Sequence, residues 1–174
     1  MRKQKGFSLI ELLIVVAIIL IIAAIAIPNL LRARIAANES SAVSSVRTIN
    51  TAEVTYQTAY PTTGYANTLA ALGPTSATTC TPAVGSACLI DWVLAQAAPG
   101  TAGKSGYVFA ATPLVPLNGI NTSYVLGASP VTYNQSGIRN FCSGDDAVLR
   151  FNAGASGSTP VNTAAGCQAF TVLQ

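Results

Sequence analysis

The pattern of apolar and polar residues divides the chain into three parts. From Leu12 to Ile27 sixteen residues in succession are apolar, which predicts a helix that is apolar on all sides. From Pro28 to Tyr60 apolar residues recur at steps of three and four, which predicts that the helix continues with one apolar stripe. After Pro61 the apolar runs are short and are separated by Gly, Pro, Asn and Ser, which is typical of strands joined by turns.

The stripe needs a surface to cover it. Its members are Leu31, Ile35, Ala42, Val46, Ile49, Tyr56 and Tyr60. A helix from Phe7 to Ala59 would be about 80 Å long. Pro28 cannot donate a hydrogen bond to the carbonyl of Ala24 and predicts a kink. That kink fits a simple exit from a membrane and equally a place where the helix bends or unwinds on assembly.

Residues 61–174 are the predicted cover. Residues 61–106 form a connecting region with helical turns in NTLAALGP and CLIDWVLAQAAPG, where Leu89, Trp92 and Val93 are expected to pack. Residues 107–174 are expected to form an antiparallel sheet and a C-terminal loop. Its extended runs are 107–112, 123–133, 138–142 and 147–151. The predicted fold class is α+β, a long N-terminal helix whose stripe lies on one face of a small antiparallel sheet.

Composition points to contacts with other protein surfaces. Hydrophobic residues make up 51% of the 174 residues and charged residues 9%, and the net charge of +3 equals the contribution of Arg2, Lys3 and Lys5. No basic field for nucleic acid remains once those three are set aside. The bland Ser/Thr/Ala/Gly-rich surface expected after residue 60 suits contact with further copies of the chain.

The four cysteines indicate disulfides and an oxidising compartment. They form no C-x-x-C pair, and without histidine no Cys/His metal site can be assembled. Pairing of sequence neighbours, Cys80 with Cys88 and Cys142 with Cys167, would stabilise the fold by about 2.6 and 3.5 kcal/mol on the loop-entropy estimate. Four cysteines allow three connectivities, so the other two remain open.

The sequence offers little for catalysis or metal binding. It has no histidine, no phosphate-binding loop and no nucleophile beside a base. We therefore expect no enzyme, no cofactor and no metal. Asp145 and Asp146 are weak calcium candidates, since two adjacent carboxylates in a Ser-Gly turn more often form a solvated hairpin.

Glu11 distinguishes three interpretations of the N-terminus, because it stands at the head of the apolar run. A secretory signal peptide cut near Ala26 would tolerate it poorly, and a plain membrane anchor would leave its charge unpaired at a cost of about 2.5 to 3.5 kcal/mol. A cut after Gly6 would instead create an ammonium on Phe7, four residues before Glu11. A neighbouring copy shifted along the axis could offer that amine to Glu11, and the pair would then select the stagger between copies.

The segment KGFSLIELLIVVAIILIIAAIAIPNLLRAR resembles the N-terminal signature of type IV pilins and of the pseudopilins of type II secretion. The resemblance implies a leader of residues 1–6, a transmembrane and filament-core helix over 7–27 and an amphipathic helix over 28–60. It also implies cleavage between Gly6 and Phe7 by a prepilin peptidase, N-methylation of Phe7, and an assembly role for Phe7, Glu11 and Pro28. The loop closed by Cys142 and Cys167 resembles the disulfide-bounded loop of many pilins.

The resemblance predicts a structural subunit of a type IV pilus that serves adhesion, twitching motility or DNA uptake. A pseudopilin of a type II secretion system is the alternative, and a secreted soluble binding domain is the other. The implied partners are further copies of the chain, the peptidase that also methylates, and an inner-membrane assembly platform with its motor ATPases. The implied location is the inner membrane with a periplasmic head before assembly, and an extracellular pilus afterwards.

Overall fold

The computed structural model describes residues 8–173, and at Val115 only the backbone. Its described residues divide into two compact units, 8–34 and 35–173. The helix α1 (Leu9–Ala59) contributes to both units. We call the described part of the second unit, residues 35–173, the head.

The head is an α+β fold. Two short helices, α2 (Leu69–Leu72) and α3 (Trp92–Ala95), precede the sheet. The strands are β1 (Tyr107–Leu117), β2 (Ile120–Pro130), β3 (Arg139–Gly144), β4 (Arg150–Ala153) and β5 (Thr171–Val172), with α4 (Ala164–Gln168) between the last two. They form one antiparallel meander in the order β1-β2-β3-β4-β5. The predicted fold class is confirmed.

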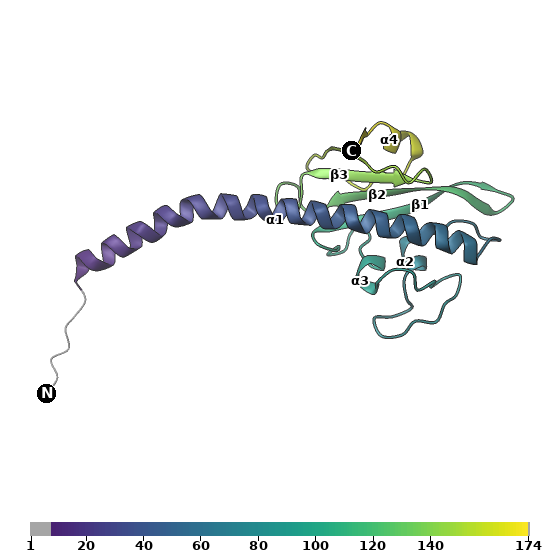
Figure 1. The fold of residues 1–174 in the computed structure, drawn as a ribbon, viewed down its shortest axis with the longest axis horizontal. Coiled ribbons are helices and arrows are strands. Elements are labelled where there is room, and N and C mark those ends of the chain that lie inside the picture. Colours follow the sequence, from purple (N-terminus) through teal and green to yellow (C-terminus); the bar gives the residue numbers. More distant parts are fainter. Residues whose placement is uncertain (1–7, 174) are drawn as a thin grey trace. The chain divides into compact units, whose positions relative to one another are not determined.

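The helix α1 packs on one face of this sheet (Figure 1). Ala42, Val46, Ile49 and Tyr56 of the predicted stripe are almost fully buried. They share one core cluster with Tyr107, Phe109, Tyr124, Leu126, Ala128 and Phe141 of the first three strands. The sheet therefore covers this part of the predicted stripe, whereas Leu31, its first predicted member, is 42% exposed.

The sheet is covered on both faces, which differs from the predicted single covered face. Val125 and Cys142 lie on the face away from α1, in a second cluster with Cys167. At Gly127 a Cβ would come 2.3 Å from the carbonyl oxygen of Val161, so the C-terminal segment crosses β2 at a distance that only glycine permits. This second layer explains why β2 is buried continuously from Tyr124 to Pro130 instead of alternately.

The strand lengths also differ from the prediction. The first run was expected to end at Thr112, whereas β1 continues through Pro113 and Pro116. Proline is tolerated there because β1 is an edge strand, so one row of its backbone groups needs no ladder partner. In the connecting region Leu89 packs against the core as expected, but Val93 is 55% exposed and the neighbouring Leu94 is buried instead.

Candidate assembly site

The first part of α1 exposes an unbroken apolar surface. Its large side chains from Leu9 to Leu31 are between 42% and 80% exposed. The most apolar 18-residue window of α1 has a mean hydropathy of 3.3 and no buried residue, and by length and composition the helix is able to cross a membrane. A surface of this size is stable only when lipid or other protein covers it.

Glu11 caps the N-terminus of this helix. The backbone N–H of Ser8 donates to Glu11 Oε2 at 3.0 Å, and the N–H of Leu12 donates to the carbonyl of Ser8 at 3.3 Å. Ser8 and Glu11 thus have the spacing and one of the two bonds of a capping box. A carboxylate in the first helical turn also faces the positive end of the helix dipole. The S-x-x-E spacing was readable in the sequence, and it gives Glu11 a local partner that the sequence interpretation missed.

The other predicted assembly residues have different positions. Gly6 and Phe7 lie outside the described residues. Pro28 lies inside α1, which continues helically through it. Arg32 and Arg34 follow the apolar part on the exposed surface of the helix, so the charge-free stretch between Glu11 and these arginines includes Pro28.

An ion pair between the buried Glu39 and the half-exposed Arg139 joins α1 to the sheet. Glu39, only 6% exposed, accepts the backbone N–H groups of Ile138 and Arg139 at 3.0 Å each through Oε1. Its Oε2 accepts Nε of Arg139 at 2.7 Å and a second guanidinium nitrogen at 2.6 Å. The guanidinium also lies 5.6 and 5.5 Å from the ring centroids of Phe141 and Phe151. One carboxylate therefore joins the helix to the first residue of β3.

Glu53 is a second buried carboxylate on the same helix face. Its side chain is fully buried, and Oε2 accepts the backbone N–H of Ala66 at 2.9 Å. Its Oε1 has no hydrogen-bond partner among the described residues. Removal from water raises the pKa of Glu53 from 4.5 to about 7, although the bond from Ala66 acts in the opposite direction.

The loop of residues 64–66, which Glu53 contacts, has a backbone conformation that requires glycine at position 64. Gly64 has a φ of +77°, and a Cβ there would lie 2.1 Å from the carbonyl oxygen of Asn121. The N–H of Tyr65 donates to that oxygen at 3.1 Å, and the Asn121 amide donates back to the carbonyl of Tyr65 at 2.8 Å. Glu53 and the β1–β2 hairpin thus fix residues 64–66 from two sides.

The buried charge of Glu53 predicts a pH-dependent stability. Because its pKa is higher in the folded than in the unfolded chain, the stability that Glu53 contributes is fully present below about pH 4.5 and is lost as pH rises towards 7. The expected slope of the free energy of unfolding is up to about 1.4 kcal/mol per pH unit. The chain has no histidine to add a transition in this range.

Chemical denaturation of the full chain in detergent between pH 5 and 7 measures this slope. The isosteric variant Glu53→Gln should give a flat profile over the same interval. An equal slope in both proteins would show that Glu53 is not the titrating group.

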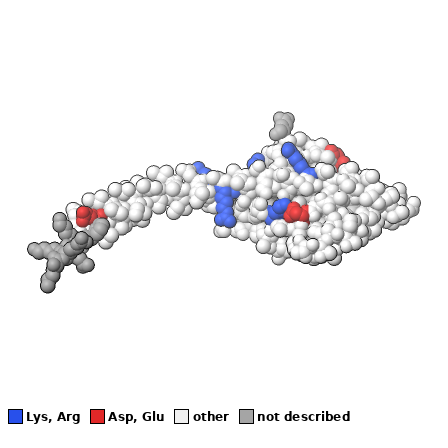
Figure 2. All heavy atoms as spheres, turned by 60° about the horizontal axis from the view of Figure 1, so that its bottom comes forward, with Lys and Arg blue, Asp and Glu red and all other residues white. Residues whose placement is uncertain are grey.

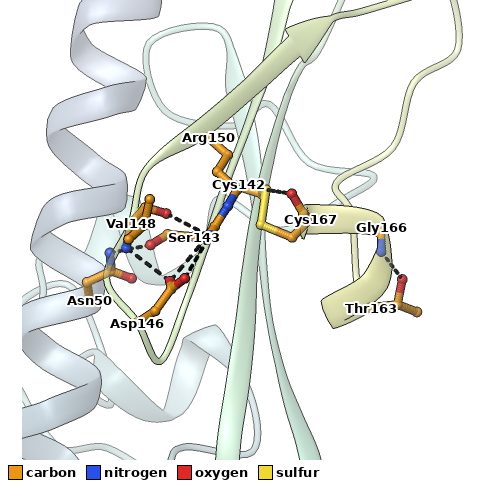
Figure 3. The surroundings of a disulfide bond; sticks show 9 residues. All are labelled: Asn50, Cys142, Ser143, Asp146, Val148, Arg150, Thr163, Gly166 and Cys167. Carbon is orange, nitrogen blue, oxygen red and sulfur yellow. Dashed lines mark hydrogen bonds and ion pairs between the residues drawn. A yellow bond between two sulfur atoms is a disulfide. The ribbon is translucent and has the colours of Figure 1, made fainter. Parts of the chain in front are cut away.

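The structure joins Cys80 to Cys88 and Cys142 to Cys167, with Cα atoms 6.0 and 5.7 Å apart. The second bond is buried and connects β3 to α4 (Figure 3). Thr163 caps α4 by accepting the N–H of Gly166 at 3.2 Å. The C-terminal segment, expected as a loop, is therefore partly helical and covers the outer face of the sheet.

The two calcium candidates have different surroundings. Asp146 is held by Arg150 through two bonds of 2.6 and 3.3 Å, which lower the pKa of its carboxyl below the usual range. Asp145 is exposed in the turn after β3. The described residues contain no group of three or more side chains of the kinds that commonly hold a metal ion. With Asp146 engaged by a guanidinium, this turn does not fit a calcium site.

Sequence reasoning missed the buried polar residues of α1, although a signal was present. Ile35, Glu39, Ala42, Val46, Ile49, Glu53 and Tyr56 follow one another at steps of four and three and are all buried. The two glutamates thus occupy positions of the apolar stripe. A charged residue in register with a stripe indicates a buried carboxylate with a specific partner.

Comparison with known proteins places the N-terminus in a recognised class. Residues 1–27 match the prokaryotic N-terminal methylation motif. The chain is 68% identical over 40 residues to the major component of the type IV wide pilus of Thermus thermophilus, a match to 23% of this chain and 30% of that protein. It is 44% identical over 54 residues to the type IV major pilin protein of Myxococcus xanthus, covering 31% and 24%.

A third relative is the type II secretion system core protein G of Vibrio cholerae, which is 39% identical over 66 residues, or 36% of this chain and 45% of that protein. The chain thus spans less than half the length of each of these relatives. No solved structure matches the chain significantly. The N-terminal segment carries a prepilin-type motif.

Proposed function

We propose that this chain is a structural subunit that polymerises through the apolar part of α1 into a type IV pilus. The observation that carries the proposal is the methylation motif over residues 1–27, which coincides with the exposed apolar first part of a long helix. An apolar helix that lipid covers before assembly can move into a filament core, where copies of the same helix cover it instead.

The processing steps follow from the motif. A prepilin peptidase cuts between Gly6 and Phe7 and methylates the new amine of Phe7. The subunit waits in the inner membrane with its head in the periplasm, where the two disulfides form. An assembly platform and its motor ATPases then add it to the filament, which serves adhesion, twitching motility or DNA uptake.

One observation favours a second candidate, a pseudopilin of a type II secretion system. Of the three relatives described above, the secretion-system protein of Vibrio cholerae has the longest match and the largest covered share. A pseudopilin would share the processing and the helical core but would build a short periplasmic filament.

The deciding experiment is mass analysis of protein sheared from the surface of the native cells. A subunit of a surface pilus appears in that fraction and begins with methylated Phe7. The same processed N-terminus found only in the cell envelope would favour the pseudopilin. A start near Ile27 in the medium, without filaments, would contradict both.

Replacing Glu11 by alanine should leave the chain cleaved and inserted in the membrane but poorly polymerised. In the subunit Glu11 accepts the N–H of Ser8, and in the filament we propose that it also meets the amine of Phe7 of a neighbouring copy. Loss of that pairing removes the register signal, so the yield of sheared filaments should fall at least about tenfold.

The variant Glu11→Gln separates the two roles of this side chain, because glutamine keeps a capping acceptor without the charge. It should assemble as poorly as the alanine variant. Normal filament yield from the glutamine variant would show that the cap, not the charge, is what assembly requires.

A further inference from the structure

Two charges of the head have no ion-pair partner among residues 8–173. Over residues 35–173 four basic and five acidic side chains are present. Three pairs account for most of them: Arg139 with Glu39, Lys104 with Asp91, and Arg150 with Asp146. Glu53 is buried. Among the described residues of the head, Arg47 and Asp145 alone remain, with opposite signs.

Arg47 lies on an exposed face of α1 and is the only charged residue among the described residues of that face. We call this the outer face, and its residues are Ser44, Arg47, Thr48, Thr51, Val54, Thr55 and Thr58. The hydroxyls of its four threonines each donate to a carbonyl four residues earlier, at 2.8 to 3.1 Å. Another surface can therefore cover this face without leaving those donors unpaired, and Arg47 is the charged group that would then need a partner.

Asp145 stands beside a hollow of about 190 Å³ between the β3–β4 turn, β2 and α4. The walls include Leu114, Tyr124 and Gln168, and Arg150 also lines the hollow. That arginine is held by Asp146, as Figure 3 shows, so this pair is internally neutralised. The hollow thus offers one carboxylate without an ion-pair partner near the side chains of Leu114 and Tyr124, a setting that suits the head and stem of an arginine.

We propose that the outer face of α1 in one copy docks on the β3–β4 turn of a second copy, with the guanidinium of Arg47 on the carboxylate of Asp145. The inference rests on the filament proposed above. Charge complementarity is its basis, because the described part of each head carries one cation and one anion without an ion-pair partner, on a surface with few other charges (Figure 2). Burying Arg47 or Asp145 without its partner would leave an unpaired charge and cost free energy. The pair therefore favours this alignment of the two copies over shifted alignments.

Cross-linking between two distinguishable chains tests the contact directly. Cells express one full-length chain carrying Arg47→Cys and another carrying Asp145→Cys, and sheared filaments are oxidised mildly. We expect a cross-linked peptide pair that contains both new cysteines, which neither chain expressed alone can give. Filaments of normal yield without this cross-link would overturn the proposal while leaving the pilus assignment intact.

Charge exchange is the second arm of the test. Arg47→Asp and Asp145→Arg alone should each lower filament yield several-fold, whereas the double variant should return it to near the wild-type level. The unassembled chains in detergent should unfold at unchanged temperature. A double variant as poor as the single ones would overturn the proposal.

Two further results have distinct meanings. Destabilised single variants in detergent would show that the pair forms within one chain, which also overturns the contact between copies. A wild-type chain that forms no filament of any kind would refute the proposed function itself, and this inference with it.

Discussion

Replacing Glu39 with alanine is expected to lower the free energy of unfolding by about 2 to 4 kcal/mol. The change removes the acceptor of two backbone N–H groups and of the Arg139 guanidinium at once. Those donors lie at the first residue of β3 and just before it, and the Glu39 carboxylate accepts all of them. Such donors cost more when left unpaired than the bonds contributed when made.

Lys104→Gln is the matched control, because it breaks an ion pair that lies at the surface. Asp91, its partner, is 50% exposed in its side chain and keeps its bond to the N–H of Leu94 at 3.0 Å. The expected loss is below about 1 kcal/mol. Denaturant unfolding of the three full-length proteins in detergent gives both values. Similar losses in the two variants would show that burial does not set the strength of the Glu39 pair.

The sequence predicted those parts of the fold that follow from a regular spacing of apolar residues. The stripe from Ile35 to Tyr56 packs on the sheet, and the break after Tyr60 follows the end of α1 by one residue. Local turn signals likewise placed four of the strands and the turns of α2 and α3. These features depend on neighbours within one or two helical turns or one hairpin, so a single sequence contains them.

Residues whose role depends on distant partners were not predictable in this way. Glu39 meets residue 139 and Glu53 meets residue 66, and nothing local names those partners. The second layer on the sheet depends on Pro160 and Val161 crossing at Gly127, which no pattern around the glycine indicates. The two-residue strand β5 is likewise defined only by its pairing with β4.

At the candidate site the opposite holds, because the assembly segment is short and continuous. Gly6, Phe7, Glu11 and Pro28 were selected from one run of residues, and the methylation motif matches residues 1–27. Their roles in cleavage, methylation and assembly remain predictions. The cap between Ser8 and Glu11 is also local, and the S-x-x-E spacing indicates it, although the sequence interpretation did not include it.

Removing the disulfide between Cys142 and Cys167 is expected to destabilise the head more than removing the one between Cys80 and Cys88. The first bond closes a sequence separation of 25 residues and the second a separation of 8. Loop entropy alone assigns them about 3.5 and 2.6 kcal/mol. Burial adds to the difference, because Cys142 and Cys167 form the centre of the outer cluster with Val125.

The double variants Cys142→Ala/Cys167→Ala and Cys80→Ala/Cys88→Ala form a matched pair for this comparison. Without its anchor α4 should separate from the sheet first, because the segment from residue 154 to 170 contributes few other buried side chains. In the first variant, amide hydrogen exchange should therefore increase across α4 and also at the amides of positions 125 and 142. In the second variant, faster exchange should stay within residues 74–90. An equal or larger loss of unfolding free energy in the second variant would contradict a stabilising role for the outer layer.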